Sequence, residues 1–507
     1  MHDAMLVSLF AYFFLMMAIG YYGYRNATSD VSEFMLGDRK LHPAIGALSA
    51  GASDMSGWML MGLPGAIYLS GISAAWIAVG LVIGAYFNYL LVAPRLRIYT
   101  EMTDDAITIP DFFEKRFLDT SRSLRVLSSI VIIVFFTLYT SSGVVAGGKL
   151  FEASFGLDYE IGLFITASAV VAYTLFGGFL AVSITDFVQG CIMFVALVLV
   201  PSVAFIDLGG YNTISSTLIS IDPEFLNWFS GVTLLGLLSS LSWGLGYFGQ
   251  PHIIVRFMAI RTLGDIQKAR HIGMSWMLVT VLGAVATGLV GLAYVTVRGG
   301  SLADSETIFI YLSQVLFHPY ITGFLLAAIL AAIMSTISSQ LLVSSSSLTE
   351  DFYKSFIHRD ASQRELVLVG RLSILGVALV AIALSFDRSN SILSLVSNAW
   401  AGFGAAFGPI ILLSLYWRNM TRDGALAGMI TGAVTVLVWI YAPIQIDGKN
   451  LTSYLYEIIP GFILSFIAAI VVSLFTSKPQ ACITDRFDKM RQFITEYVDK
   501  RTLRKSN

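Results

Sequence analysis

Residues 49–62 read SAGASDMSGWMLMG, and this stretch decides how the rest of the chain is interpreted. It lies within residues 43–70, a run that is otherwise apolar and longer than the roughly 20 residues that cross a bilayer. Asp54 falls close to the middle of this run. A charge at the centre of a bilayer costs roughly 2.5 to 3.5 kcal/mol on insertion scales, so we expect the fold to offset that cost.

Small residues surround this carboxylate, among them Gly51, Ser56 and Gly57. Glycine weakens a helix by up to about 1 kcal/mol per residue, so the pattern predicts an unwound segment with free carbonyl groups around Asp54. Carbonyl and carboxylate oxygens are the ligands that a hard cation needs. In the alternative interpretation, the glycines only allow close helix packing and Asp54 pairs with a neighbouring helix.

The composition of the chain is that of a membrane protein that crosses the bilayer many times. Of its 507 residues, 56% are hydrophobic and 13% are charged, and the mean hydropathy is +0.76. Soluble domains carry about 25% charged residues. Nothing in the composition indicates a nucleic-acid partner. Cys191 and Cys482 lie far apart without metal-ligand spacing, so we predict neither a disulfide nor a cysteine metal site.

Thirteen apolar segments are long enough to span a bilayer. They are residues 5–24, 43–70, 73–93, 124–152, 159–178, 184–206, 229–250, 272–297, 319–346, 367–386, 391–417, 424–443 and 456–476. The first lacks the charged start and cleavage site of a signal peptide, so we expect it to be retained. Residues 1–477 are therefore predicted to form one transmembrane domain, followed by a charged, helical cytoplasmic tail at 478–507.

The Lys and Arg residues predict the orientation. With the N-terminus outside and the C-terminus in the cytoplasm, all of the 31 except four lie on the cytoplasmic side, as the positive-inside rule requires. The four exceptions are Lys149, Arg298, Arg388 and Lys449. Arg256 is counted here in the cytoplasmic loop after the seventh segment.

A second interrupted segment is SSLSWGLGYFGQPHIIVRF, residues 239–257. Its glycines loosen the helix, and Pro251 removes a backbone donor near the expected inner end. Trp243 and Tyr247 are four residues apart and would share one helix face, although aromatic residues at this spacing are also common in ordinary packing. Two interrupted spans, five apart, are typical of a transporter site between inverted repeats.

A third feature is LLAAILAAIMSTISSQLLVSSSSLTEDFYK, residues 325–354, which places Ser335, Thr336, Ser338 and Ser339 in mid-span. Ala332 precedes Ser335 by three residues and Thr336 by four, so one carbonyl and two hydroxyls share a helix face. They could line one cavity. Alternatively, these hydroxyls only bond back to the preceding turn or across a helix interface.

Five blocks carry a resemblance to a known family. They are LSAGASDMSGWMLMGLPGAIYLSGIS, FFTLYTSSGVVAGGKLFE, WGLGYFGQPHIIVRFMA, LAAIMSTISSQLLVSSSSLTEDFYK and NAWAGFGAAFGPIILLSLYWRNMTRDGALAGMITGA. With these blocks, which extend over most of the chain, the sequence resembles the sodium/solute symporter family and, within it, the proline branch. The resemblance implies an all-α membrane fold of about thirteen helices. Segments 2–6 and 7–11 would form inverted five-helix repeats (LeuT-like), with one leading and two trailing helices.

The same resemblance implies the site residues. The sodium ligands would be the main-chain carbonyls of Ala52, Met55 and Ala332 with the hydroxyls of Ser335 and Thr336, and Asp54 would be the carboxylate that couples sodium to transport. The substrate site would contain Ser56, Gly57, Trp58, Tyr139, Trp243 and Tyr247. A proline zwitterion suits such a site, because its ring needs an apolar wall and its ammonium can rest against an aromatic face.

The function implied is sodium-coupled symport of L-proline into a bacterial cell across its cytoplasmic (inner) membrane, by alternating access. The partners would be proline, sodium and the lipid bilayer, with Na⁺ as coupling ion and no other cofactor. A symporter of another amino acid, a sugar or a vitamin acid is the alternative. A membrane enzyme or a channel-like sensor is a third reading, but the six histidines show no HExxH or similar spacing, and no signalling segment is appended. The sequence predicts no oligomeric state.

Overall fold

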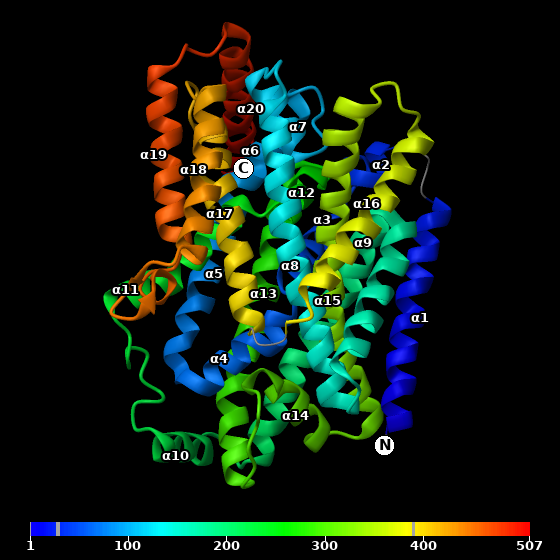
Figure 1. The fold of residues 1–507 in the computed structure, drawn as a ribbon, viewed down its shortest axis with the longest axis vertical. Coiled ribbons are helices and arrows are strands. Elements are labelled where there is room, and N and C mark those ends of the chain that lie inside the picture. The colour runs from blue at the N-terminus through cyan, green and yellow to red at the C-terminus, as the bar shows by residue number, and fades with distance from the viewer. Residues whose placement is uncertain (1, 27–30, 388–390, 507) are drawn as a thin grey trace.

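The chain folds into long helices that run along the longest axis of the molecule (Figure 1). The computed structural model describes residues 2–26, 31–387 and 391–506. The α-helices are α1 (His2–Asn26), α2 (Val31–Leu36), α3 (Pro43–Asp54), α4 (Leu63–Ser70), α5 (Trp76–Phe87), α6 (Ala93–Met102), α7 (Ile109–Phe117), α8 (Ser123–Phe155), α9 (Tyr159–Asp207), α10 (Tyr211–Ile221), α11 (Leu234–Ser242), α12 (Pro251–Ala259), α13 (Leu263–Val297), α14 (Ile308–Leu316), α15 (Pro319–Ser346), α16 (Gln363–Leu384), α17 (Ile392–Tyr416), α18 (Arg422–Tyr441), α19 (Ile458–Phe475) and α20 (Ala481–Ser506).

Shorter elements join or interrupt these helices. The 3₁₀ turns are η1 (Gly37–Arg39), η3 (Gly71–Ala75), η5 (Trp243–Gly249), η6 (Ser305–Thr307) and η8 (Leu451–Ser453). The π-helical turns are η2 (Trp58–Gly62), η4 (Asn88–Val92) and η7 (Ser347–Ile357). Two short strands, β1 (Gln445–Ile446) and β2 (Lys449–Asn450), form an antiparallel pair between α18 and α19, with Gln445 opposite Asn450.

The predicted all-helical membrane fold is confirmed, whereas the count of thirteen spans stays a prediction. Ten helical stretches of the described chain are long and apolar enough to cross a membrane, and Tyr159–Leu175 and Leu234–Gly249 are shorter apolar helices. The counts differ for two reasons. Part of the second predicted span and the whole of the third lie in one stretch, Trp58–Met102, and the fifth and seventh predicted spans contain the two shorter helices. The fifth and sixth predicted spans also belong to one helix, α9.

The fifth and sixth predicted spans meet at a single glycine. Gly178 has φ 61° and ψ −167°, a conformation that glycine adopts at little cost. A Cβ atom at this position would lie 2.8 Å from the Phe34 ring. The loop expected between residues 178 and 184 is therefore replaced by a kink at one residue, against which the segment before α3 packs.

The seventh predicted span is longer than the sequence indicated. Instead of ending at residue 250, it continues through α11, η5 and α12 to Ala259. Pro251 occupies the first turn of α12, where its missing N–H breaks no helical hydrogen bond, and the helix continues beyond it to Ala259. Its place near the inner end stays a prediction. Arg256, expected in a cytoplasmic loop, is fully buried in α12 instead. Its charge is compensated by Asp186, whose carboxylate lies 3.2 Å from the guanidinium.

The two chain termini lie toward opposite ends of the molecule (Figure 1), as expected for a chain that crosses the membrane an odd number of times. Figure 1 shows the N-terminus at the same end as α10 and α14, and α2, α7 and α20 at the opposite end. Which end faces the cytoplasm stays a prediction, and Arg388 lies outside the described residues. The tail is helical as expected, and α20 packs onto α6 through Phe487, whose ring centroid lies 6.2 Å from that of Tyr99.

Candidate functional site

The predicted unwound segment is present in the second span. α3 ends at Asp54, Met55 has φ −84° and ψ 76°, and helical structure resumes at Gly57, directly before η2. The Asp54 carbonyl, released from the helix, accepts hydrogen bonds from the Trp58 indole at 3.1 Å and from the Tyr139 hydroxyl at 3.4 Å. The break is therefore held by side chains from η2 and α8.

The Asp54 carboxylate is buried, with 2% of the residue exposed. Its Oδ2 accepts a hydrogen bond from the Tyr247 hydroxyl of η5, and its Oδ1 has no hydrogen-bond partner among the described residues. Both interpretations of the sequence are thus represented in the structure. One oxygen bonds a neighbouring element, and the other remains free beside the break.

The oxygens expected to bind sodium come together, with one exception. Ser335 Oγ lies 2.7 Å and Thr336 Oγ1 3.5 Å from the Ala52 carbonyl, and both hydroxyls lie 3.1 to 3.2 Å from the Ala332 carbonyl. The alternative interpretation expected these hydroxyls to bond back to the preceding turn, and the contacts to Ala332 are such bonds. The contacts to Ala52 join α15 to α3 as well. No hydrogen bond joins the Met55 carbonyl to these four atoms in the described chain.

A second charged group, which the sequence analysis missed, lies on α9 and α12. Asp186 Oδ2 accepts hydrogen bonds from Ser49 at 2.7 Å and from Arg256 at 3.2 Å, and Arg256 also donates to Ser339 at 2.5 Å. Both ionised residues are 0% exposed. The sequence contained a signal, since Asp186 is a carboxylate inside an apolar span just as Asp54 is. Its partner Arg256 was not recognised, because the seventh span was predicted to end at residue 250.

The aromatic residues predicted for the substrate are all buried, but they do not form one group. Tyr139 and Tyr247 both direct their hydroxyls to Asp54. Trp243 instead stacks on Tyr456, with ring centroids 5.2 Å apart. The predicted shared face of Trp243 and Tyr247 is wrong, because η5 has three residues per turn and residues four apart then point in different directions.

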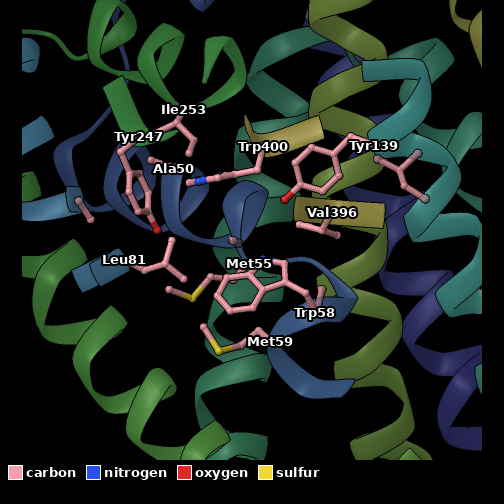
Figure 2. Packing of buried hydrophobic residues seen from close by; sticks show 14 of the residues in the cluster. Ala50, Met55, Trp58, Met59, Leu81, Tyr139, Tyr247, Ile253, Val396 and Trp400 are labelled. Carbon is pink, nitrogen blue, oxygen red and sulfur yellow. The ribbon is translucent and has the colours of Figure 1, made fainter. Parts of the chain in front are cut away.

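Trp400 of α17 is an aromatic residue of this region that sequence reasoning did not select. Its ring meets that of Tyr247 edge to face at 5.0 Å, and its Nε1 donates to the Trp243 carbonyl at 2.8 Å. Figure 2 shows Trp400 beside Tyr247 and Tyr139, with Met55 and Trp58 across from them. A Cβ at Gly246 would lie 1.9 Å from that nitrogen, so glycine is required for this approach. In the sequence, Trp400 lies in NAWAGFG, residues 398–404, a part of one of the five blocks that carry the family resemblance.

The two remaining predicted substrate residues lie at the break. Ser56 is buried, and its Oγ accepts from the backbone N–H of Trp58 at 3.5 Å. Gly57 packs closely on α8, since a Cβ there would lie 2.9 Å from the Cβ of Ala146. The packing interpretation therefore applies to Gly57, whereas the unwound backbone is provided by residues 55 and 56.

The sequence is similar to a known transporter family over most of its length. Residues 34–432 match the model of the sodium:solute symporter family. The chain is 58% identical over 489 residues to the osmoregulated proline transporter OpuE of Bacillus subtilis, covering 96% of this chain and 98% of the relative. It is 56% identical over 493 residues to sodium/proline symporter 2 of Staphylococcus saprophyticus, covering 97% and 96%.

Among solved structures, the fold is similar to that of a Na⁺-coupled sialic acid symporter in a substrate-bound, outward-open state. The TM-score is 0.80 at 17% identity, with 94% of this chain and 99% of the other covered. At this identity the likeness concerns the fold alone, and it confirms the predicted LeuT-like architecture.

Proposed function

Because this chain belongs to the sodium:solute symporter family, and is therefore a transporter rather than an enzyme, we propose that it carries L-proline into the cell together with sodium, by alternating access. Two relatives that are 56% and 58% identical over nearly the whole chain are named as proline transporters. The proposed setting is the cytoplasmic membrane of a bacterium, with the N-terminus outside and α20 in the cytoplasm.

The observation that carries sodium coupling is the meeting of the Ser335 and Thr336 hydroxyls with the Ala52 carbonyl at the break in α3. Two elements far apart in sequence, α3 and α15, there offer oxygens at one point, and a monovalent hard cation binds oxygens. A sodium ion between them would bond to both elements at once. Binding would therefore favour the conformation in which α3 and α15 are together.

Met55 and Asp54 complete the proposed sodium site in different ways. The Met55 carbonyl belongs to the unwound residues and is the proposed fifth ligand, reached by a small rotation of the chain that is no longer fixed by a helix. Asp54 supplies a negative charge close by, which offsets the desolvation of the cation in a buried place. The carboxylate need not touch the ion to act in this way, since charges in a low-dielectric interior interact over several ångströms.

The proposed substrate site lies beside the same break. Ser56 and Gly57 provide the backbone and Trp58 one wall, and Tyr139 and Tyr247 provide hydroxyls and ring faces. A pyrrolidine ring packs against such faces, and its charged groups need only a few polar contacts. Trp243 joins this site through Trp400, which connects it to Tyr247.

Transport into proteoliposomes tests the function directly. Purified protein should accumulate radiolabelled L-proline when an inward sodium gradient is imposed, and should not when potassium replaces sodium. Excess unlabelled amino acids, sugars and vitamin acids are then added in turn. Strong competition by proline alone supports the proposal, whereas sodium-driven uptake that another solute blocks more strongly than proline identifies the alternative symporter.

A further inference from the structure

A small buried cavity of about 30 Å³ lies beside Asp54, with room for about one or two water molecules. Its polar lining consists of Asp54, Asn88, Tyr89 and Tyr247, and the rest of the wall is apolar. Asn88 is 1% exposed, and neither its amide oxygen nor its amide nitrogen has a partner among the described residues. Asp54 Oδ1 is unpartnered as well.

Three unpaired polar atoms around one cavity require an explanation, because buried polar groups in native proteins are nearly always hydrogen-bonded. A carboxylate oxygen is an acceptor only, whereas an amide offers two donors and one acceptor. Together they match a ligand that carries both a protonated amine and a carboxylate.

The sequence brings Asn88 to this position through a repeated spacing that begins on α5 and ends at the first residue of η4. Gly80, Gly84 and Asn88 are four residues apart and lie on one helix face. A Cβ at Gly80 would lie 2.5 Å from the Leu241 carbonyl, and one at Gly84 would lie 2.2 Å from the Gly244 carbonyl. This face therefore touches α11 and η5, the elements that carry Tyr247 to Asp54. The next residue on the face, Asn88, continues the contact into the cavity.

Local backbone structure also marks this position. Asn88 is the first residue of the π-helical turn η4. Such turns are rare, since they insert an extra residue into a helix, and they occur frequently at functional sites.

One side chain is shared by the small cavity and a larger one. Tyr89 lines both the small cavity and a second cavity of about 370 Å³, whose wall includes Arg270 of α13 and Tyr497 of α20. Three methionines, Met55, Met274 and Met277, form part of the wall of the small cavity. Methionine side chains adapt readily to a change of shape, so this wall can widen when Tyr89 moves.

We propose that Asn88 and the free oxygen of Asp54 bind the charged head of the transported imino acid as it passes toward the α20 end of the molecule. The substrate ammonium donates to Asp54 Oδ1 and to the Asn88 carbonyl oxygen, and the substrate carboxylate accepts from the Asn88 amide nitrogen. The 30 Å³ cavity is smaller than the substrate, so the site forms when Tyr89 and the methionines move apart. This inference rests on the proposed function, since it takes proline as the cargo.

Binding measurements on purified full-length protein test this role. The dissociation constant of radiolabelled L-proline is measured at saturating sodium for the wild type, Asn88→Ala and Asn88→Asp. Loss of the amide removes two proposed hydrogen bonds to charged groups, so it should weaken proline binding by at least about tenfold. Asn88→Asp should weaken it at least as much, because the new carboxylate repels that of the substrate.

Leu91→Ala is the matched control, since Leu91 belongs to the same π-helical turn but lines neither cavity. It should bind proline as the wild type does, and thermal melting should show that all variants are folded. A second readout is the ratio of affinities for proline and pyrrolidine, which lacks the carboxylate. Asn88→Ala should lower this ratio, an effect that a general loosening of the fold does not produce.

Three results would decide against the inference. Unchanged proline affinity in both Asn88 variants would mean that the cavity holds water only. A tighter apparent sodium affinity in Asn88→Asp, with proline affinity retained, would mean that the cavity binds a cation. An unchanged ratio for pyrrolidine would make Asn88 structural. If the wild type itself fails to bind proline, the proposed function fails instead, so the two failures are distinguishable.

Discussion

At the scale of single residues, Asp54 uses its two carboxylate oxygens differently. Oδ2 accepts from Tyr247, and Oδ1 is unpartnered in the described part of the chain. Among the described residues, Asp54 has a hydrogen-bond partner in Tyr247 but no Lys or Arg partner. In the proposed function, a bound cation takes the place of such a partner.

The effect of charge and that of geometry at this residue can be separated by two substitutions. Asp54→Asn keeps the size and an acceptor for Tyr247 but removes the charge, so sodium-driven proline uptake should be abolished at ordinary sodium. Asp54→Glu keeps the charge on a longer arm and should retain measurable uptake at high sodium. Uptake into proteoliposomes at equal protein amounts provides the measurement.

Ser53→Ala is the control for these substitutions, because Ser53 is a buried neighbour whose hydroxyl donates to the Ala50 carbonyl of its own helix, at 3.2 Å. It should transport like the wild type. Near-native uptake by Asp54→Asn would instead assign Asp54 to helix packing, since neutral hydrogen bonds in membranes average only about 0.6 kcal/mol.

The hydroxyls of Ser335 and Thr336 give a second prediction at this scale. Replacing both by alanine removes two oxygens from the proposed sodium site, so apparent sodium affinity should fall by roughly tenfold or more, equivalent to at least about 1.4 kcal/mol. Apparent proline affinity should weaken through linkage, and added sodium should partly restore it. Sodium dependence of proline uptake is the measurement.

Ser346→Ala serves as the comparison, because the Ser346 hydroxyl bonds the Leu342 carbonyl of its own helix at 2.9 Å and lies in the last turn of α15. This variant should keep the sodium dependence of the wild type. If the double variant keeps it too, the ion binds elsewhere.

At the scale of elements, Asp119 connects α7 to α8. Its carboxylate accepts from the Ser121 hydroxyl at 2.6 Å and from the backbone N–H of Leu124, in the first turn of α8, at 2.8 Å. Burial alone would raise the pKa of Asp119, but the hydrogen bonds and the nearby Arg422 outweigh it, so the pKa is lowered. The ionised form is therefore favoured by the folded state.

The sign of the pH dependence follows from this shift. A carboxyl whose folded pKa is depressed contributes stability above its ordinary value of about 4, and this contribution is lost as the pH falls below that value. Asp119→Ala should destabilise the protein at neutral pH by about 1 to 2 kcal/mol, as loss of a helix cap does. The difference in melting temperature from the wild type should shrink as the pH is lowered below about 4.

Asp158→Ala is the matched control for thermal melting in detergent. Asp158 also precedes a long helix, α9, but its side chain makes no capping hydrogen bond. Its replacement should change the melting temperature little at any pH. Equal melting temperatures for the wild type and Asp119→Ala at neutral pH would contradict the role given to Asp119.

At the scale of the whole molecule, the charge distribution predicts the orientation in the membrane. The N-terminus and α20 lie toward opposite ends (Figure 1), and the distribution of Lys and Arg assigns the α20 end to the cytoplasm. Two positions report on the two ends. Asp3 is exposed near the start of α1, and Cys482 is an exposed native cysteine of α20.

Labelling by a membrane-impermeant thiol reagent tests this orientation in a Cys191→Ser background. In intact cells, a cysteine placed by Asp3→Cys should be labelled, whereas Cys482 should react only after the membrane is permeabilised. Labelling of Cys482 in intact cells, with protection of the cysteine at position 3, would reverse the orientation. Labelling of both would contradict an odd number of spans.

The sequence by itself determined the features that depend on local composition. The lengths of the apolar segments predicted the helices. The glycines beside Asp54 and in residues 243–249 predicted both interruptions, because a weak helix former destabilises the helix at its own position. The pairing of Ser335 and Thr336 with Ala52 came from the resemblance to a family.

The tertiary structure alone decided which distant side chains meet. Arg256 is buried because Asp186, 70 residues earlier in the chain, offers it a carboxylate. Trp243 and Tyr247 point apart because packing winds η5 into a 3₁₀ turn, which changes the period that local spacing assumes. Asn88 lies beside Asp54 because the glycines of α5 allow two backbones to touch. Such contacts are set by the packing of whole elements, and no window of neighbouring residues contains that information.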